Sequence, residues 1–223
     1  MLSVCYKYIC IFLNAKSDTM KGNALNDDLQ YWHSFKKGDE LSFEFLFNKF
    51  YSVLINYGHK FSSERYIIEE SVQDLFVKLW NNRLTLGDPE IVKPYLFKAF
   101  RTIIFRKLRK NSVYLQERLN DERYDFRIEL APDQLIINNE KTEEVRRKIQ
   151  KGLSALTSRQ LEAIYLRFYE DMAYEQISEI LQMNIGGTYK LIYRAIERLR
   201  EKIGSVLLFI FIASSAAETL PIS

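Results

Sequence analysis

Residues 153–203, LSALTSRQLEAIYLRFYEDMAYEQISEILQMNIGGTYKLIYRAIERLREKI, decide the fold that this sequence predicts. Apolar residues recur there at helical spacing in three successive segments. Met183 and Asn184 separate the second segment from the third, and Asn184 is suited to cap the third helix. A connection of this length predicts a helix-turn-helix. The apolar positions are Leu161, Ile164, Tyr165 and Phe168, then Ile177, Ile180 and Leu181, then Ile185, Thr188, Leu191, Ile192, Ala195, Leu199 and Ile203.

The last of these helices has a second face that is polar and basic. Two glycines in its first turn allow another backbone to approach closely, beside a helix N-terminus that favours phosphate. A helix that enters the DNA major groove needs such a slim, positive leading end. The face therefore predicts DNA binding, and an ordinary solvated face of a three-helix bundle is the alternative. It comprises Gly186, Gly187, Tyr189, Lys190, Tyr193, Arg194 and Arg198.

The composition of the whole chain favours an all-α protein. Its 223 residues suffice for one large domain or two small ones, and a hydrophobic content of 47% supports real cores. Four prolines, eight glycines and long segments of helical period leave little room for a sheet. The net charge of +3 is modest and hides local charge asymmetry, which is more informative.

The sequence offers no constellation for catalysis, a metal or a cofactor. Cys5 and Cys10 are the only cysteines, which excludes a disulfide framework and a cysteine-based metal site. His33 and His59 are isolated and are expected at the surface or at the edge of the core. Neither a phosphate-binding loop nor a Ser/His/Asp arrangement is present. We therefore predict no enzyme activity, no cofactor and no small-molecule substrate.

Both ends of the chain are apolar. Residues 1–13 lack a strong basic segment and a cleavage site, so we expect no signal peptide, and Met20 is an alternative translation start. Residues 206–213, VLLFIFIA, are far too few to span a bilayer. They are expected to pack on the preceding domain or to form a docking or membrane-surface tail. A cytoplasmic protein is the expectation.

The first half of the chain also predicts helices. Residues 25–61 give two, with Asp27 or Asp28 as the cap of the first, a break at residues 36–39, and Gly58 at the end of the second. The next helix is expected to begin after Ser62 or Ser63, and a further one has Pro94 in its first turn and runs to about Lys110.

The helix over residues 94–110 mixes cations with aromatic residues. Tyr95, Phe97 and Phe105 are interleaved with six positive charges and no acid. Such a mixture suits single-stranded nucleic acid, whose bases stack on rings while its phosphates meet cations. The alternative, equally open at this point, is that the rings fill the core and the cations are solvated. The cations are Lys98, Arg101, Arg106, Lys107, Arg109 and Lys110.

Residues 111–140 predict a flexible, acidic linker. Seven acids against three bases give a local charge of −4 between two basic regions, and Pro132 interrupts the weak apolar pattern. A transient helix is expected near residues 113–119. In the free chain the linker is expected to fold back on the basic surfaces. The acids assigned to this role are Glu117, Asp121, Glu122 and Asp125.

The order of these parts resembles the extracytoplasmic-function (ECF) sigma factors of bacterial RNA polymerase. The resemblance covers roughly residues 27–205. Any one of its motifs is weak, and all of them in order are specific. Besides the basic last helix, they are KKGDELSFEFLFNKFY, EESVQDLFVKLWNNR, PYLFKAFRTIIFRKLRK and LTSRQLEAIYLRFYEDMAYEQISEIL.

The resemblance implies a role for three groups of residues. One group docks on the polymerase clamp helices, although a solvated face is the alternative; it comprises Glu70, Gln73 and Asp74. A second captures and melts the −10 promoter element, through base edges or phosphates; it comprises Asn81, Asn82, Lys98, Arg101, Arg106 and Arg109. A third contacts the −35 element as duplex; it comprises Gly187, Tyr189, Lys190, Tyr193 and Arg194.

The resemblance also implies a domain organisation and partners. The expected parts are an N-terminal extension (1–24), a region-two domain (25–110), the linker (111–140), a region-four domain (141–205) and an apolar tail (206–223). The expected partners are core RNA polymerase and promoter DNA, both duplex and melted. A membrane-linked anti-sigma factor is a further implied partner, although no residue of the chain identifies one.

Two departures from the family pattern concern helix caps. Thr157 stands where proline is frequent, and it can form a capping box with Gln160 instead. Ala173 stands where a capping serine is common, so the helix after it is expected to have less support.

Two other functions remain as alternatives, a stand-alone helix-turn-helix regulator and a membrane-associated signalling protein that uses the apolar ends.

Overall fold

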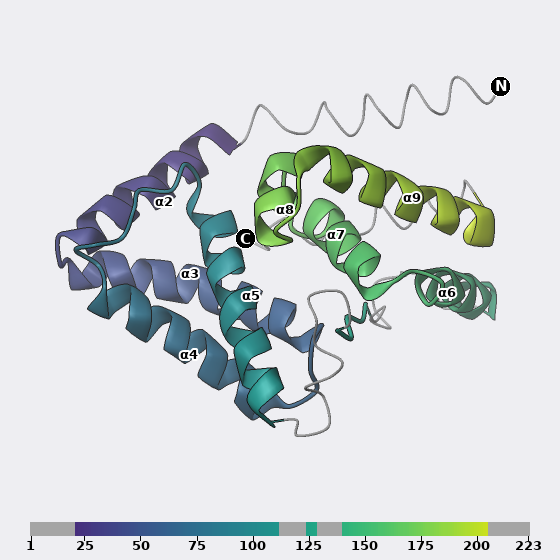
Figure 1. Ribbon diagram of the computed structural model, residues 1–223, viewed down its shortest axis with the longest axis horizontal. Coiled ribbons are helices and arrows are strands. Elements are labelled where there is room, and N and C mark those ends of the chain that lie inside the picture. Colours follow the sequence, from purple (N-terminus) through teal and green to yellow (C-terminus); the bar gives the residue numbers. More distant parts are fainter. Residues whose placement is uncertain (1–20, 112–123, 129–139, 205–223) are drawn as a thin grey trace.

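The computed structural model describes residues 21–111, 124–128 and 140–204. Across these ranges every regular element is a helix, which confirms the predicted all-α fold with a helix-turn-helix in the C-terminal half. Figure 1 shows the N-terminal helices on one side and the C-terminal helices on the other. The helices are α2 (Lys21–Lys36), α3 (Glu40–His59), α4 (Arg65–Asn81), α5 (Val92–Asn111), α6 (Glu140–Leu153), α7 (Ser158–Phe168), α8 (Tyr174–Ile180) and α9 (Ile185–Ile203).

The predicted break between the first two helices is present, but the N-cap predicted for the first helix is wrong. Gly38 turns the chain with a positive φ of 97°, and Asp39 caps α3 by accepting the Ser42 backbone N–H at 3.0 Å. Asp27 and Asp28 lie inside α2 and cap nothing. Asp28 is buried and binds Lys49 at 2.5 Å, because a buried carboxylate needs a partner.

The start of α4 also differs from the prediction. Neither Ser62 nor Ser63 is its N-cap, since that position belongs to Glu64, whose side chain makes no capping bond. Ser62 instead accepts the Glu64 backbone N–H through its hydroxyl at 3.0 Å, which tightens the turn before the helix. Pro94 lies in the first turn of α5, as predicted.

Gly58 has a packing role that differs from the predicted one. It is not the end of α3, which continues to His59. A Cβ at Gly58 would lie 2.4 Å from Ile68 Cγ2 and 3.1 Å from Phe100 Cζ. Glycine is therefore required here because α4 and α5 approach α3 too closely for any side chain.

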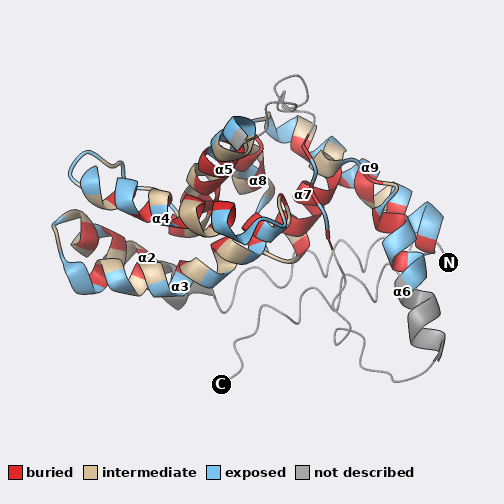
Figure 2. Cartoon of the chain, turned by 90° about the horizontal axis from the view of Figure 1, so that it is seen from below, coloured by how far each residue is buried: buried red, intermediate tan, exposed pale blue. Residues whose placement is uncertain are grey.

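Aromatic side chains build the core of the N-terminal half. Phe97 and Phe105 are buried, and Tyr95 packs edge-on against Trp32 with ring centroids 5.1 Å apart. The three rings interleaved with the α5 cations therefore pack in or against the core and are not free to stack on bases. Figure 2 shows the buried residues along the inner faces of α3, α4 and α5.

The helix caps observed in the C-terminal half are those that the sequence predicts. Thr157 and Gln160 form the predicted capping box, and Asn184 caps α9 by accepting the Gly187 N–H at 2.7 Å. Ala173 offers no acceptor before α8, and only half of a capping box remains, in which Gln176 accepts the Ala173 N–H at 2.9 Å.

The predicted apolar stripes of the C-terminal half face its core, with one exception. Ile185 is 43% exposed at the first position of α9. Leu191 is partly buried, and the other predicted positions are buried. The last helix therefore turns one face to the core along most of its length, which leaves its polar face outward.

One segment of the linker is packed, which corrects the expectation of a flexible chain there. Residues 124–128 run extended between the two halves, with Tyr124, Phe126 and Ile128 buried. The Arg127 N–H donates to Lys60 O at 2.9 Å, and the Phe126 N–H donates to Ser158 Oγ at 3.3 Å. The segment is thereby bound to both halves.

Other predictions fall outside the described residues. These are the N-terminal segment with its two cysteines, the helix expected near 113–119, and the apolar tail. Within the described ranges, none of the helices combines the length and the apolar character needed to cross a membrane. His33 and His59 are exposed, as predicted for surface positions.

An alanine at position 58 is expected to destabilise the protein, because its methyl group would overlap Ile68. Overpacking of this kind costs about 1–3 kcal/mol, and the loss is measured as a lower free energy of unfolding in urea. Gly87→Ala is the matched control, since a Cβ there meets nothing within 4 Å. Equal stabilities of the two variants would contradict the close packing around Gly58.

Candidate nucleic-acid interface

The polar face of α9 is exposed to solvent. Tyr189 and Tyr193 are 48% and 52% exposed, and Lys190 and Arg194 are also exposed. Tyr189 stacks on Tyr174 of α8 with centroids 4.1 Å apart, which fixes the ring at the surface. The five residues predicted to contact duplex DNA, including Gly187, thus share one accessible, positively charged helix face. Such a face has the chemistry to enter a major groove.

A second exposed face lies on α4. Gln73 is exposed, and Glu70 and Asp74 are partly exposed one helical turn apart. Tyr66 and Val77 extend this face, with 73% and 56% of their surface exposed. The face therefore presents charged, polar and apolar side chains to solvent together. The spacing from Tyr66 to Val77 at helical periodicity is the sequence signal that would have added both residues.

Lys107 holds the two carboxylates of this α4 face. Its Nζ lies 2.7 Å from Glu70 Oε2 and 3.0 Å from Asp74 Oδ2. Burial would lower the pKa of Lys107, but the hydrogen bonds to the two carboxylates outweigh it and raise that pKa above its usual value. Lys107 therefore belongs to the α4 face electrostatically, and it is not part of the solvent-facing positive charge of α5.

The residues assigned to the −10 element do not form a single surface. Asn81 and Asn82 are exposed at the end of α4, where Asn82 Nδ2 donates to Lys78 O at 2.9 Å. Arg106 and Arg109 are exposed on α5. The two remaining cations of that set, Lys98 and Arg101, face the C-terminal half instead.

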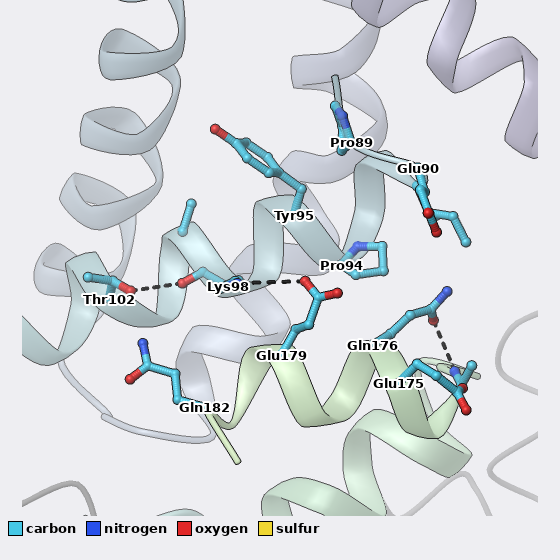
Figure 3. A pocket seen from close by; sticks show the side chains of 13 residues that line it. Pro89, Glu90, Pro94, Tyr95, Lys98, Thr102, Glu175, Gln176, Glu179 and Gln182 are labelled. Carbon is cyan, nitrogen blue, oxygen red and sulfur yellow. Dashed lines mark hydrogen bonds and ion pairs between the residues drawn. The ribbon is translucent and has the colours of Figure 1, made fainter. Parts of the chain in front are cut away.

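Three cations of α5 bind carboxylates of the C-terminal half. Lys93 Nζ lies 2.8 Å from Glu170 Oε2, and Lys98 Nζ lies 3.6 Å from Glu179 Oε2. Figure 3 shows Lys98 and Glu179 reaching toward each other across a cleft of about 680 Å³ between α5 and α8. The third cation is Arg101, which is only 5% exposed. In this arrangement Arg101 has no access to a phosphate, contrary to its predicted position on a DNA-binding surface.

Arg101 belongs to a buried polar cluster around Glu162, a carboxylate with no exposed surface. Glu162 Oε1 accepts from Arg101 Nε at 2.8 Å and from the Tyr57 hydroxyl at 2.5 Å. Glu162 Oε2 accepts from Arg101 Nη2 at 3.3 Å and from the Tyr124 hydroxyl. We call these four residues the Glu162 cluster. They come from α3, α5, the linker and α7.

The pKa values of the hydrogen-bond donors in the Glu162 cluster are shifted so that each donor keeps its proton. Burial, followed by the negative charge of Glu162, raises the pKa of Tyr57 and of Tyr124 well above the usual tyrosine value. Burial would lower the pKa of Arg101, but the Glu162 carboxylate more than offsets it and the pKa is raised. Both phenols therefore stay protonated and donate to Glu162 at neutral pH.

Comparison with known proteins identifies the C-terminal half. Residues 146–199, which contain α7, α8 and most of α9, match the family model for sigma-70, region 4. Over 160 residues the chain is 22% identical to the RNA polymerase sigma factor YlaC of Bacillus subtilis (strain 168), a span that covers 69% of this chain and 87% of that protein.

Two solved structures share the fold. One is CnrH in complex with the cytosolic domain of CnrY, with a TM-score of 0.53, 15% identity, and coverage of 78% of this chain and 96% of that one. The other is the sigma factor RpoE in complex with the anti-sigma factor NepR from Bartonella quintana, with a TM-score of 0.52, 24% identity, and coverage of 72% and 96%.

Residues 146–199 thus carry a sigma-70 region 4 domain, and the chain is similar to an RNA polymerase sigma factor along most of its length. These likenesses support a function in transcription initiation. The Glu162 cluster was not predicted from the sequence. The alternation Tyr124-Asp125-Phe126-Arg127-Ile128 is a period of two that would have marked a packed, extended segment. Glu162 stands in an otherwise apolar run on α7, and a charge in such a run signals a buried partner.

The described part of the chain contains no group of His, Cys, Asp and Glu residues with the geometry to hold a metal ion. The cleft between α5 and α8 is lined mainly by polar side chains and two prolines, with Lys98 and Glu179 bridging it. The chemistry available at these surfaces is therefore recognition through charge, hydrogen bonds and stacking.

Removal of the Tyr57 hydroxyl is expected to destabilise the protein. Tyr57→Phe deletes a buried hydrogen bond to an ionised carboxylate, and such bonds contribute about 1.5–3 kcal/mol. The measurement is the free energy of unfolding in urea. Tyr66→Phe is the control, because Tyr66 is 73% exposed and its change is expected within about 0.5 kcal/mol. The same small effect for both variants would mean that Tyr57 does not support Glu162.

Proposed function

We propose that this sigma factor binds core RNA polymerase and directs it to promoters whose −10 and −35 elements it contacts with separate surfaces. The observation that carries the proposal is the exposed, basic face of α9 within the range that matches region 4 of sigma-70. A helix with this charge and exposure is suited to the major groove of the −35 element. The protein works where the polymerase works, in the cytoplasm, and the catalysis of RNA synthesis belongs to the polymerase.

The N-terminal half, residues 25–110, supplies polymerase docking and −10 recognition in this proposal. The α4 face with Gln73 at its centre contacts the polymerase clamp, since it combines exposed polar and apolar groups. Asn81 is exposed at the end of α4 and is placed to contact a base edge. Arg106 and Arg109 follow the melted strand as phosphate contacts, because exposed cations suit a single-stranded backbone.

An anti-sigma protein is the third partner that we propose. Two solved structures with this fold are complexes, CnrH with the cytosolic domain of CnrY and RpoE with the anti-sigma factor NepR. A membrane-linked protein of this kind would keep the sigma factor from the polymerase until a signal arrives.

A stand-alone transcriptional regulator is the second candidate, because the basic face of α9 is open in the free chain. Run-off transcription separates the two candidates. The sigma factor is expected to produce a defined transcript only when it is added to core polymerase. Tight binding of promoter duplex by the chain alone, without any effect on start-site choice, would favour the regulator.

The membrane-associated alternative is tested by truncation to residues 20–205. Because this piece retains every surface assigned above, we expect it to direct the same transcripts as the full chain. Loss of directed transcription by a folded truncated protein would show that the apolar ends are needed.

Gln73→Arg is expected to weaken binding to core polymerase at least tenfold, because a charge buried in a protein interface costs more than about 1.4 kcal/mol when it has no partner. The measurement is the dissociation constant of the labelled sigma factor and core polymerase. Gln30→Arg introduces the same charge at an exposed site of α2 and is the control. An unchanged constant for Gln73→Arg would exclude this face from docking.

Lys190→Ala and Arg194→Ala each test the α9 face. If the side chain contacts a phosphate, the slope of log affinity against log salt is expected to fall by about one. If it contacts a base, the loss is about 1–3 kcal/mol on one sequence only. Promoter-duplex binding is measured across a salt series, with Lys202→Ala at the far end of α9 as the control. No change in either quantity would remove the residue from the DNA contact.

A further inference from the structure

Apolar side chains line the centre of the exposed α9 face. Ile185, Tyr189 and Tyr193 are 43%, 48% and 52% exposed, and they follow one another at four-residue intervals. Residues four apart lie on one side of a helix, so the three form a single strip. Lys190 and Arg194, each the next residue after a tyrosine, are also exposed and place positive charge beside the strip. A partner of this face must therefore offer negative charge together with an apolar group.

The ring of Tyr189 is held by a stack that reaches back to α7. Tyr189 stacks on Tyr174, the first residue of α8, with ring centroids 4.1 Å apart and 18° between the ring planes. The guanidinium of Arg167 on α7 lies over the Tyr174 ring, 5.3 Å from its centroid. Arg167 also donates to Met172 O at 3.0 Å, and its side chain is only 12% exposed. We call Arg167, Tyr174 and Tyr189 the Tyr189 stack.

The stack limits what Tyr189 presents to a partner. Tyr174 covers one face of the ring, which leaves the opposite face and the ring edge for contact. Stacking restricts the side chain before any partner arrives. Because the ordering of side chains is part of the cost of binding, a ring that is already fixed in the free protein binds at a smaller cost. Tyr189 is thus preorganised for contact with an apolar group.

The DNA major groove offers one apolar group that such a ring can contact. The base edges present hydrogen-bond donors and acceptors, and only thymine adds a methyl group, at C5. Apolar side chains contact this methyl group, whereas arginine, lysine, asparagine and glutamine bind the polar edges. Residues at the N-terminal end of a recognition helix reach the base edges. Tyr189 is the fifth residue of α9, so its ring lies where base edges are contacted.

The first turn of α9 has no polar side chain that could take over base recognition. Gly186 and Gly187 follow Ile185, and Thr188 is buried. The side chains that point outward among the first five residues of α9 are thus those of Ile185 and Tyr189. Neither has the two separate hydrogen-bonding atoms that a bidentate contact with a base requires. Discrimination at this end of the helix therefore depends on apolar contact.

We propose that the Tyr189 stack recognises the C5 methyl group of a thymine in the duplex that α9 binds. Tyr189 makes the contact, and Tyr174 and Arg167 are positioning residues that hold its ring. The inference rests on the function proposed above, because it requires duplex DNA on α9. It adds a specificity to that function, since one thymine of the −35 element is recognised through its methyl group.

The test uses the full chain bound to core polymerase and a duplex that this complex, but not core polymerase alone, enriches from a random library. Each thymine of that duplex is replaced in turn by deoxyuridine, which keeps the base pair and removes only the methyl group. We expect one replacement to raise the dissociation constant, measured by fluorescence anisotropy, by about fourfold, the value of one buried methyl group. We call this ratio of dissociation constants the thymine preference.

Two negative results have different meanings. A duplex in which no replacement weakens binding would overturn the methyl contact and leave the proposed function standing. Failure of the complex to enrich any duplex would contradict the proposed promoter recognition itself, and this inference with it.

Variants of Tyr189 assign the methyl contact to the ring. Tyr189→Ala is expected to bind the thymine and deoxyuridine duplexes equally, because the apolar contact is lost. Tyr189→Phe keeps the ring without its hydroxyl and is expected to retain the thymine preference. Leu41→Ala is the control, since Leu41 is an apolar side chain on α3 that is 75% exposed, and it should also retain the preference. A preference that survives in Tyr189→Ala, or disappears in Tyr189→Phe, would overturn the proposal.

Variants of Tyr174 test the positioning role. Tyr174→Leu removes the ring on which Tyr189 stacks, so the thymine preference is expected to fall toward one, and Tyr174→Phe is expected to restore it. A merely structural role of Tyr174 would weaken binding of both duplexes by the same factor and leave their ratio unchanged. Helix content from circular dichroism checks that each variant is folded. An unchanged ratio in folded Tyr174→Leu would show that the stack does not position Tyr189.

Discussion

The buried carboxylate of Glu162 is the constraint on which the arrangement of this protein depends. A charge with no exposed surface is tolerated only when every lone pair has a donor. Glu162 finds its donors on three other segments, in Tyr57, Arg101 and Tyr124. The C-terminal half alone cannot supply these hydrogen-bond donors. For this reason α3, α5 and the linker must pack against it. The contact between the halves follows from this requirement.

The same contact explains why the surfaces differ in accessibility. The α4 and α9 faces lie outside this contact and remain exposed to solvent. The side of α5 that carries Lys98 and Arg101 points into it and is neutralised by acids of the other half. The accessibility of Arg101 and Lys98 is thereby tied to the relative position of the two halves.

The sequence predicted features whose cause is local. The Thr157–Gln160 capping box, the Asn184 cap and the α9 faces depend on residues within one helical turn, and all are present. Features whose cause is a distant segment escaped prediction. Asp28 binds a lysine on another helix, and Glu162 gathers donors from residues up to 105 positions away. Periodicity in a single sequence places a residue on a face but carries no information on which segment covers that face.

The distance between the two halves tests the central claim most directly. Spin labels at Asn48→Cys on α3 and Glu201→Cys on α9, both exposed, report it when Cys5 and Cys10 are changed to serine. Pulsed electron spin resonance is expected to give one short distance in the free protein and a longer one when core polymerase is added. The same distance in both states, with polymerase shown to be bound, would contradict the account.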